Sequence, residues 1–390
     1  MRVKVINKKP VKIWTERVEA SAMKQIENLT KLPFLYHHLA IMPDVHAGMG
    51  MPIGGVLACV DTVIPNAVGV DIGCGMCAVK TNWKASQLSR DIIIKKIMPK
   101  IYERIPVGAA HHKQAQDINL LPQDHEIERM EVVARRYAAI RHEIGTLGGG
   151  NHFIELQRDE NDYLWIMIHS GSRNLGKQVG EHYNKLASTL NHRWHADFAN
   201  EINLPFLPVG SNEFNNYWRE MQFCIDFALC NRKLMMDRIE EILADTLKGI
   251  EFEPMINIAH NYAAWENHFK KNVIVHRKGA TLARKGTIGI IPGSQGTASY
   301  IVEGLGNPDS FCSCSHGAGR RMSRRDAIRK LDLAAEQRRL DNLGVVHSMT
   351  NQNKLDEAAS AYKNIDTVLR NEMDLVQIVT KLMPLAVVKG

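Results

Sequence analysis

Aromatic residues, long apolar runs and a regular cysteine framework are scarce or lacking in this sequence. Phe, Trp and Tyr make up only 6% of the 390 residues and are not interleaved with basic residues, which argues against a base-stacking platform for single-stranded nucleic acid. No run reaches the roughly 20 apolar residues of a membrane helix, and the N-terminus has no apolar signal-peptide core. The seven cysteines form an odd, sparse set. We therefore expect no disulfide framework, no membrane partner and a reducing, cytoplasmic setting.

The charge of the chain is mildly basic. The 49 Lys and Arg residues exceed the 42 Asp and Glu residues and give a formal net charge of +7. This balance permits a polyanionic partner without requiring one. Apolar residues at 45% and charged residues at 23% predict a globular protein with a substantial core.

Secondary-structure signals follow one another without a Pro-, Ser- or Gly-rich linker. A chain of this length can hold one large domain or two ordinary ones. Because glycine-rich loops with reactive side chains are scattered from residue 44 to residue 316, we expect one domain that gathers them into one site. Apolar patterning predicts a strand and then a helix within 11–32, short buried strands over 39–82, and further strands at 163–170, 272–277 and 287–291. It predicts an exposed loop at 108–117. The predicted helices lie at 85–105, 121–143, 177–195, 216–248, 323–339, 354–360 and 365–382.

Five short segments share one signature, a candidate metal ligand beside glycine or another small residue. Glycine lets the backbone approach an ion or a phosphate closely. A mixture of carboxylate, imidazole and thiolate suits a borderline divalent ion such as Mn²⁺, Zn²⁺ or Co²⁺, so this recurrence predicts a metal site. The segments are PDVHAGMG (Asp44, His46), VDIGCGMC (Asp71, Cys74, Cys77), GGGNHFIE (Asn151, His152, Glu155), IMIHSGSR (His169, Arg173) and IAHNY (His260, Asn261), with His316 as a sixth candidate.

Two other interpretations stay open from the residues alone. The C-x-x-C at 74–77 and the C-x-C at 312–314 hold the four thiols of a hypothetical structural zinc site, although zinc ribbons carry C-x-x-C at both ends. The segment GSRNLGKQ at 171–178 resembles a P-loop, but Gln178 stands where a Ser or Thr would hold Mg²⁺. A glycine-rich helix entrance is the simpler interpretation of that segment.

Two basic runs flank a turn of the phosphate-binding kind. RKGATLARKG at 277–286 and GRRMSRRDAIRK at 319–330 lie on either side of IIPGSQGTAS at 290–299. The turn Pro292–Gly293–Ser294 offers backbone amides and a hydroxyl of the kind that cradles phosphates, and arginine binds phosphate oxygens. Together these runs predict a surface that handles phosphate groups.

Taken together and in this order, the motifs resemble those of the RtcB-type RNA ligases, which are GTP- and Mn²⁺-dependent ligases of RNA 3′-phosphate ends. The resemblance runs from residue 43 to residue 390. No K-x-D-G motif of the lysine-adenylate ligases is present. The matching motifs are DVHAGMG, VGVDIGCGM, GTLGGGNHFIE, HSGSRNLG, HNY, RKGA, IPGSQGTAS and CSCSHGAGR.

The resemblance implies an α+β fold, with one large domain of mixed β-sheets over residues 1–390, peripheral helices around a central metal site and a helical insertion near 177–250. It also implies that two Mn²⁺ ions act and that His316 attacks the α-phosphate of the cosubstrate GTP and becomes guanylylated. The implied metal ligands are Asp71, Cys74, His152, His169 and His260. The implied guanylate pocket comprises Asn151, His152, Phe153, Ile154, Glu155, His260, Asn261, Pro292, Gly293, Ser294, Gln295, Ser299, His316, Gly317, Ala318, Gly319 and Lys389.

The activity that the resemblance implies is RNA ligation in RNA repair or tRNA splicing. RNA ends with a 3′-phosphate or a 2′,3′-cyclic phosphate are joined to 5′-hydroxyl ends through the GMP–histidine intermediate and an activated RNA 3′ end. An archease-type activator belongs to the implied partners. Two alternatives are a metal-dependent RNA cyclic phosphodiesterase or phosphohydrolase that does not seal, and a non-catalytic protein that binds RNA ends.

Four positions depart from the residues common in that family. Met49, Asn174, Gln295 and Cys77 stand where Lys, Gly, Met and Asn are frequent. None of these departures removes an implied metal ligand or the implied nucleophile. They lead to the hypothesis of a specialised repair ligase that acts on one kind of cleaved RNA.

Overall fold

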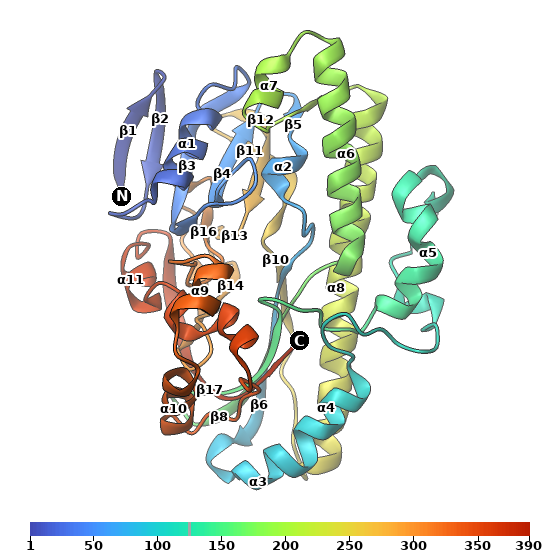
Figure 1. The fold of residues 1–390 in the computed structure, drawn as a ribbon, viewed down its shortest axis with the longest axis vertical. Coiled ribbons are helices and arrows are strands. Elements are labelled where there is room, and N and C mark those ends of the chain that lie inside the picture. The colour runs from blue at the N-terminus through green and yellow to red at the C-terminus, as the bar shows by residue number, and fades with distance from the viewer. Residues whose placement is uncertain (124–125) are drawn as a thin grey trace.

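Two large β-sheets form the framework of the computed structural model, which describes residues 1–123 and 126–390 (Figure 1). The six-stranded sheet contains one parallel pair, β2 with β3, and is otherwise antiparallel. Its strands, in spatial order, are β1 (Arg2–Ile6), β2 (Lys9–Ile13), β3 (Leu35–His46), β4 (Ile53–Cys59), β12 (Lys271–Lys278) and β11 (Asn261–His268).

The seven-stranded sheet is antiparallel throughout. Its strands, in spatial order, are β10 (Ile256–Ala259), β6 (Gly75–Lys84), β8 (Tyr163–Ser170), β7 (Phe153–Asp159), β17 (Val376–Lys389), β15 (Ser299–Gly304) and β14 (Ile288–Ile291). Only His260 separates β10 from β11, so this residue joins the two sheets. Two small ribbons complete the strands: β13 (Ala280–Leu282) with β16 (Ser313–Ser315), and β5 (Thr62–Val63) with β9 (Leu207–Pro208).

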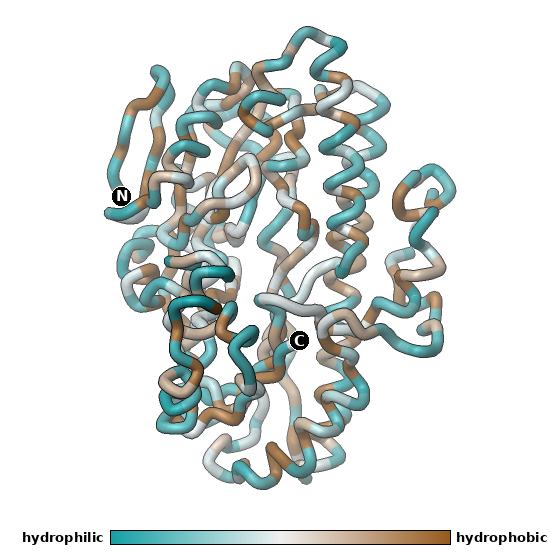
Figure 2. The backbone as a smooth tube through the Cα atoms, viewed as in Figure 1, coloured by the Kyte–Doolittle hydropathy of each residue, from teal (hydrophilic) through white to brown (hydrophobic). Residues whose placement is uncertain are grey.

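Helices surround these sheets, and the longest of them, α8 (Asn212–Thr246), runs alongside both (Figure 1). Its buried face packs on the seven-stranded sheet through Met235, Met236 and Ile239, and on α6 (Arg173–Arg193) through Tyr217 and Phe227. The other helices are α1 (Ala20–Leu29), α2 (Pro65–Val68), α3 (Arg90–Ile92), α4 (Met98–Arg104), α5 (Glu131–Glu143), α7 (Asp197–Glu201), α9 (Arg324–Lys330), α10 (Leu333–Asn342) and α11 (Ile365–Arg370). Hydrophilic residues are frequent in the lobe of α9 and α10 (Figure 2).

The predicted α+β class with mixed sheets and peripheral helices is confirmed. Among the described residues, no helix combines the length and the apolar character needed to span a membrane. The helices α6, α7 and α8 occupy most of 177–250. The interpretation of that range as an insertion into a single domain stays a prediction.

The C-terminal helix predicted over 365–382 is wrong in its second half. The helix α11 ends at Arg370, and the strand β17 begins at Val376. This strand is sandwiched between β7 and β15, and β-branched residues such as Val376, Ile378 and Val379 suit a pleated sheet. Pairing with strands distant in sequence therefore determines the structure of this segment. The local residue pattern carries no information about those strands.

Three other predicted helices differ in detail. The helix predicted over 323–339 divides into α9 and α10, because the Asp332 side chain accepts a hydrogen bond from the Ala335 amide and starts a second helix. Residues 352–357 and 359–361 form 3₁₀ turns. The helix predicted from 121 begins as α5 at Glu131, and residues 124–125 of that prediction lie outside the described part of the chain.

Candidate active site and metal centre

Four neighbouring strands bring the predicted metal ligands to one edge of the seven-stranded sheet. Cys74 precedes β6, His152 precedes β7, His169 is the penultimate residue of β8, and His260 follows β10. Because the strands are antiparallel in the order β10-β6-β8-β7, each strand that starts at this edge lies beside one that ends there. The sheet topology thus gathers residues that are up to 186 positions apart (260 − 74) in the sequence.

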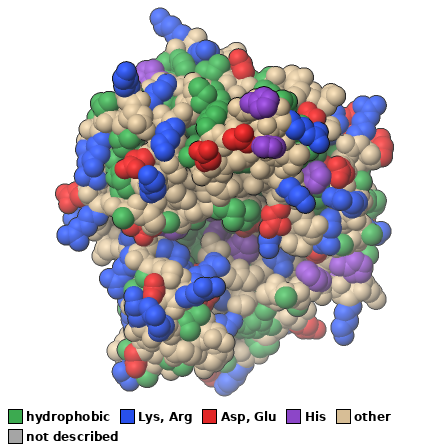
Figure 3. Space-filling model, turned by 45° about the horizontal axis from the view of Figure 1, so that its top comes forward, with side chains coloured by type: hydrophobic (Ala, Val, Ile, Leu, Met, Phe, Trp, Pro, Cys, Tyr) green, Lys and Arg blue, Asp and Glu red, His purple; other side chains and the backbone are tan. Residues whose placement is uncertain are grey.

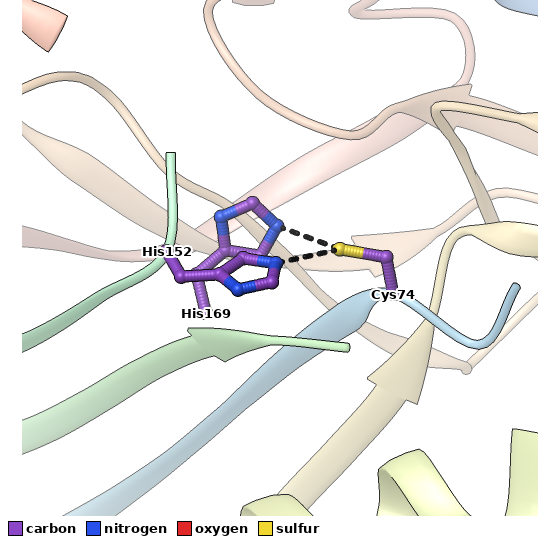
Figure 4. A group of neighbouring side chains, drawn as sticks. All are labelled: Cys74, His152 and His169. Carbon is purple, nitrogen blue, oxygen red and sulfur yellow. Dashed lines mark hydrogen bonds between the residues drawn. The ribbon is translucent and has the colours of Figure 1, made fainter. Parts of the chain in front are cut away.

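The side chains of this cluster converge on the Cys74 sulfur. Its Sγ atom lies 3.5 Å from His152 Nε2 and 3.3 Å from His169 Nε2 (Figure 4). His169 Nε2 also lies 3.4 Å from His260 Nε2, and His152 Nε2 lies 3.2 Å from Asp71 Oδ2. Cys74, His152 and His169 are buried and together have the spacing of a metal site.

Hydrogen bonds to the backbone fix the direction of two of these imidazoles. His152 Nδ1–H donates to the Leu147 carbonyl and His169 Nδ1–H to the Asn151 carbonyl, both at 3.1 Å. Each ring therefore presents the lone pair of Nε2 to the cluster, as metal-binding histidines do. Burial, followed by the neighbouring imidazoles, lowers the pKa of His169 and of His260 well below the usual value, so both are neutral and able to bind a cation.

The acidic groups of the cluster would be stabilised in their ionised forms by a cation. Burial and the adjacent Asp71 carboxylate raise the pKa of the Cys74 thiol well above its usual value, which disfavours the thiolate without a positive partner. A divalent ion would stabilise both charges, and this set of sulfur, nitrogen and oxygen donors suits a borderline divalent metal. The residues present therefore fit a metal ion. Gly171 is needed beside them because a Cβ atom there would collide with the Asp71 carboxylate.

The structural zinc site built from four cysteines is not formed. Cys77 is buried on β6 with its sulfur 3.9 Å from the Arg232 carbonyl oxygen, and the Cys314 sulfur contacts the Ser315 carbonyl. Within the described residues, only Cys74 among the thiols belongs to a metal-type cluster. All seven cysteines have free thiols.

His316 lies beside this cluster and is held by Asp44. The rings of His316 and His260 are 4.9 Å apart in an edge-to-face arrangement. Asp44 Oδ2 accepts hydrogen bonds from His316 Nδ1 at 2.6 Å and from the His316 backbone amide at 3.1 Å. Burial acts to raise the pKa of Asp44, but the charge and hydrogen bond of His316 outweigh it and lower the pKa. A carboxylate that accepts from Nδ1–H leaves Nε2 as the ring atom with a free lone pair.

Sequence reasoning found Asp44 but assigned it to the candidate metal ligands. The structure instead places this wholly buried carboxylate against His316. Gly319 makes the approach feasible: it has a φ of +72°, and a Cβ atom there would collide with the Asp44 backbone. The small residues after His316 therefore allow β3 and the 316–319 loop to come into contact.

A cleft of about 730 Å³ opens above His316. Figure 3 shows the molecule hollowed near its centre, with Lys and Arg side chains on the lobe below. Twelve residues of the predicted guanylate pocket line this cleft: Asn151, Phe153, Glu155, Pro292, Gly293, Ser294, Gln295, His316, Gly317, Ala318, Gly319 and Lys389.

The remaining predicted pocket residues lie behind the cleft. Ser299 is buried, and its Oγ accepts a hydrogen bond from the Gly293 amide at 3.2 Å, which shapes the phosphate-type turn. Asn261 Oδ1 accepts from the Gly279 amide at 2.7 Å, next to His316. Ile154 packs in the core between the seven-stranded sheet and α8. His152 and His260 belong to the metal cluster described above.

Glu357 is a residue of this site that sequence reasoning missed. Its side chain is 3% exposed, and its carboxylate contacts Arg320 at 3.2 Å, Arg324 at 3.1 Å and Lys389 at 3.4 Å. Tyr362 also donates a hydrogen bond to it. This carboxylate therefore holds three cations of the cleft wall in place. The surrounding DEAASAY offers no local signal, because Glu357 acts through partners distant in sequence.

Asn231 and Arg232 on α8 form a second missed support. The guanidinium of Arg232 donates to the Gly73 carbonyl at 3.0 Å and to the Ser170 carbonyl at 2.9 Å, and each of these residues is next to a predicted metal ligand. The Asn231 carboxamide accepts from the amides of Gly145 and Thr146. The sequence signal that could have identified Asn231 and Arg232 is the presence of two polar residues on the apolar face of a long helix.

Comparison with known proteins agrees with this site. The family model described as tRNA-splicing ligase RtcB matches residues 25–139 and 123–390. The RNA-splicing ligase RtcB of Escherichia coli strain K12 is 38% identical over 98% of this chain and 97% of its own length. The tRNA-splicing ligase RtcB of Nanoarchaeum equitans is 31% identical over 98% of this chain and 95% of its own. The chain therefore belongs to the RtcB family of RNA ligases.

Proposed function

We propose that this ligase joins RNA ends bearing a 3′-phosphate or a 2′,3′-cyclic phosphate to 5′-hydroxyl ends, through a covalent His316–GMP intermediate. The observation that carries the proposal is the Asp44–His316 pair at the floor of the cleft. Asp44 holds the proton on Nδ1, which keeps the Nε2 lone pair available for attack on phosphorus. The seven reduced cysteines support a cytoplasmic setting for this activity.

A 2′,3′-cyclic phosphate end is first hydrolysed to the 3′-phosphate, and the reaction then proceeds in three displacements, of which the first two involve His316. First, Nε2 forms a bond to the α-phosphorus of GTP, the bond from that phosphorus to the bridging oxygen breaks, and pyrophosphate leaves. The positive charge that develops on the imidazole is balanced by the Asp44 carboxylate. Next, an oxygen of the RNA 3′-phosphate attacks the GMP phosphorus and displaces Nε2. The 5′-hydroxyl oxygen of the second end then forms a bond to the phosphorus of the RNA 3′-phosphate and gives up its proton to solvent, the bond from that phosphorus to the GMP oxygen breaks, and GMP leaves.

The metal cluster lies next to the nucleophile and fits the implied Mn²⁺ ions. The Cys74 sulfur lies against His152 and His169, and these two rings are in turn next to Asp71 and His260. These five residues would hold the Mn²⁺ ions, with the Cys74 sulfur, the imidazole nitrogens and the Asp71 carboxylate as donors. When bound, such ions neutralise phosphate charge and so make phosphorus more open to attack.

Two residues of the cleft support recognition of a guanine base. Glu155 and Lys389 both line it, and they lie on the paired strands β7 and β17. A carboxyl group accepts from the N–H groups of guanine, and an ammonium group donates to its O6 atom. GTP is therefore the cosubstrate that the cleft suits best.

A ligation assay tests the proposal. Wild-type protein with Mn²⁺ and GTP should join a 3′-phosphate oligonucleotide to a 5′-hydroxyl oligonucleotide, and His316→Ala should not. His192→Ala removes an exposed histidine whose side chain is 77% accessible and is the matched control, with activity equal to wild type. Opening of a 2′,3′-cyclic phosphate without joining would point to the phosphodiesterase alternative. Equal activity of His316→Ala and wild type would refute the role of His316.

A further inference from the structure

A second groove, of about 540 Å³, adjoins the catalytic cleft. We call it the basic groove and define it by Arg321, Arg339, Tyr362, Lys363, Asp366 and Lys381, all of which line it. Arg321 and Tyr362 line the catalytic cleft as well. The two hollows therefore adjoin each other and share part of one wall.

The backbone fixes this junction. The Arg321 amide donates to the Ala361 carbonyl and the Lys363 amide to the Gly319 carbonyl, each at 2.9 Å. The Lys363 ammonium donates to the Pro43 carbonyl at 3.1 Å and also to the Val45 carbonyl. The wall between the groove and the cleft is thus anchored to both neighbours of Asp44. The groove thus lies beside the cleft that His316 lines, across a wall formed in part by Arg321 and Tyr362.

Three cations of the basic groove lack an ion-pair partner among the described residues, although Lys381 also borders a hollow lined by Asp159, Glu160 and Asp162. Within the described residues, none of Arg321, Arg339 and Lys381 forms a salt bridge. Arg321 and Arg339 are exposed and Lys381 is half-buried. By contrast, Arg320 and Arg324 of the catalytic cleft contact Glu357. Cations left free in a concave surface attract a polyanion.

The acidic residue of the groove does not cancel this charge. Asp366 accepts a hydrogen bond from the Tyr300 hydroxyl at 2.6 Å. It is the one carboxylate among the groove residues, against the three cations without an ion-pair partner, since the Lys363 ammonium donates to the Pro43 and Val45 carbonyls. The aromatic ring in the groove, Tyr362, donates its hydroxyl proton to Glu357. The groove therefore offers charge for phosphates and no row of aromatic rings for bases.

We propose that the basic groove binds the phosphodiester backbone of the RNA strand whose end lies in the catalytic cleft, without reading its sequence. This inference rests on the proposed ligase function. Its consequence is a dependence on RNA length: a strand long enough to reach Arg339 and Lys381 gains affinity from them, and a strand confined to the cleft does not.

The test compares two double variants of the full-length protein. Arg339→Ala/Lys381→Ala removes two groove cations. Arg338→Ala/Lys248→Ala removes the same charge from exposed positions outside the groove. Binding of 3′-phosphate RNA oligonucleotides of about 3 and about 20 nucleotides is measured over a range of salt concentrations. Arg339→Gln/Lys381→Gln keeps side-chain length and repeats the test if the alanine variant unfolds.

The groove variant should bind the long oligonucleotide with a slope of log K on log salt smaller by about 1.4, because each single-strand phosphate contact contributes about 0.7. If the affinities of the two proteins for RNA become equal near 1 M salt, this difference in slope corresponds to roughly 25-fold weaker binding by the groove variant at 0.1 M salt. The short oligonucleotide and the control variant should show no change.

The groove proposal would be overturned if the groove variant lost the same affinity for both oligonucleotides, or lost no affinity for the long one. Labelling of His316 by GTP provides the separate check on the proposed function, since the groove variants should be guanylylated as fast as wild type. A wild-type protein that takes up no label would overturn the proposed function. The binding measurements would still decide whether the groove holds RNA.

Discussion

Replacing Asn231 by alanine should destabilise the protein strongly and weaken its metal site. The Asn231 side chain is wholly buried in α8. Its Oδ1 atom accepts from the amides of Gly145 at 2.7 Å and Thr146 at 3.1 Å. Its Nδ2 atom donates at 3.2 Å to Thr146 O, Ser170 Oγ and Gly171 O.

The magnitude follows from the groups left without partners. The alanine variant leaves two buried amide N–H groups without an acceptor, at about 1–3 kcal/mol each. The carbonyls of Thr146 and Gly171 lose a donor at smaller cost, and Ser170 Oγ still donates to the Leu147 carbonyl. We therefore expect a loss of about 4 kcal/mol in the free energy of unfolding.

Urea unfolding followed by circular dichroism measures this loss. Asn216→Ala on the same helix removes an exposed asparagine and should change stability by less than about 0.5 kcal/mol. Metal affinity, measured by calorimetry on the folded variant, should also fall, because Asn231 braces the residues that follow His169. A loss below about 1 kcal/mol with unchanged metal affinity would refute this account of α8.

Three further predictions concern the site and its surroundings. Asp44→Asn should slow guanylylation of His316 about 10²–10⁴-fold at saturating GTP, since the charge that orients and balances the imidazole is lost; an unchanged rate of label uptake would contradict this. Cys74→Ala should abolish the thiolate-to-cobalt absorption band of the Co²⁺-loaded protein, whereas Cys77→Ala should keep it; the reverse pattern would exclude Cys74 as a ligand. Burial raises the pKa of Glu372 from 4.5 to about 8, so the folded state holds this proton more tightly than the unfolded chain, and stability falls as pH rises across that window. Glu372→Gln removes this pH dependence of stability, so the urea midpoint of the variant should exceed that of wild type by an amount that grows from pH 5 to pH 8. A difference in midpoint that stays constant with pH would contradict a buried, protonated Glu372.

The sequence predicted the ligand-bearing loops because glycine beside a ligand is a local pattern. Cys74 and His152 could be named in this way, and the family motifs placed His316 apart from them as the nucleophile. Strands such as β8 were readable from apolar runs, and α6 and α8 from helical periodicity.

Other features depend on contacts that no local pattern contains. The first half of β17, up to residue 382, was predicted as a helix because its partners, β7 and β15, are distant in sequence. Glu357 and Asn231 were missed for the same reason, because their hydrogen bonds and ion pairs are with groups distant in sequence. Asp44 was noticed but assigned a different role, because only the three-dimensional structure shows it against His316.

Identification of the covalent intermediate tests the central claim most directly. Wild-type protein is incubated with α-labelled GTP and Mn²⁺, and the modified peptide is mapped by mass spectrometry. The account predicts one GMP group on His316, lost in acid and stable in alkali as expected of a phosphoramidate, and no adduct on His316→Ala. A wild-type protein without an adduct, or an adduct mapped to another residue, would contradict it.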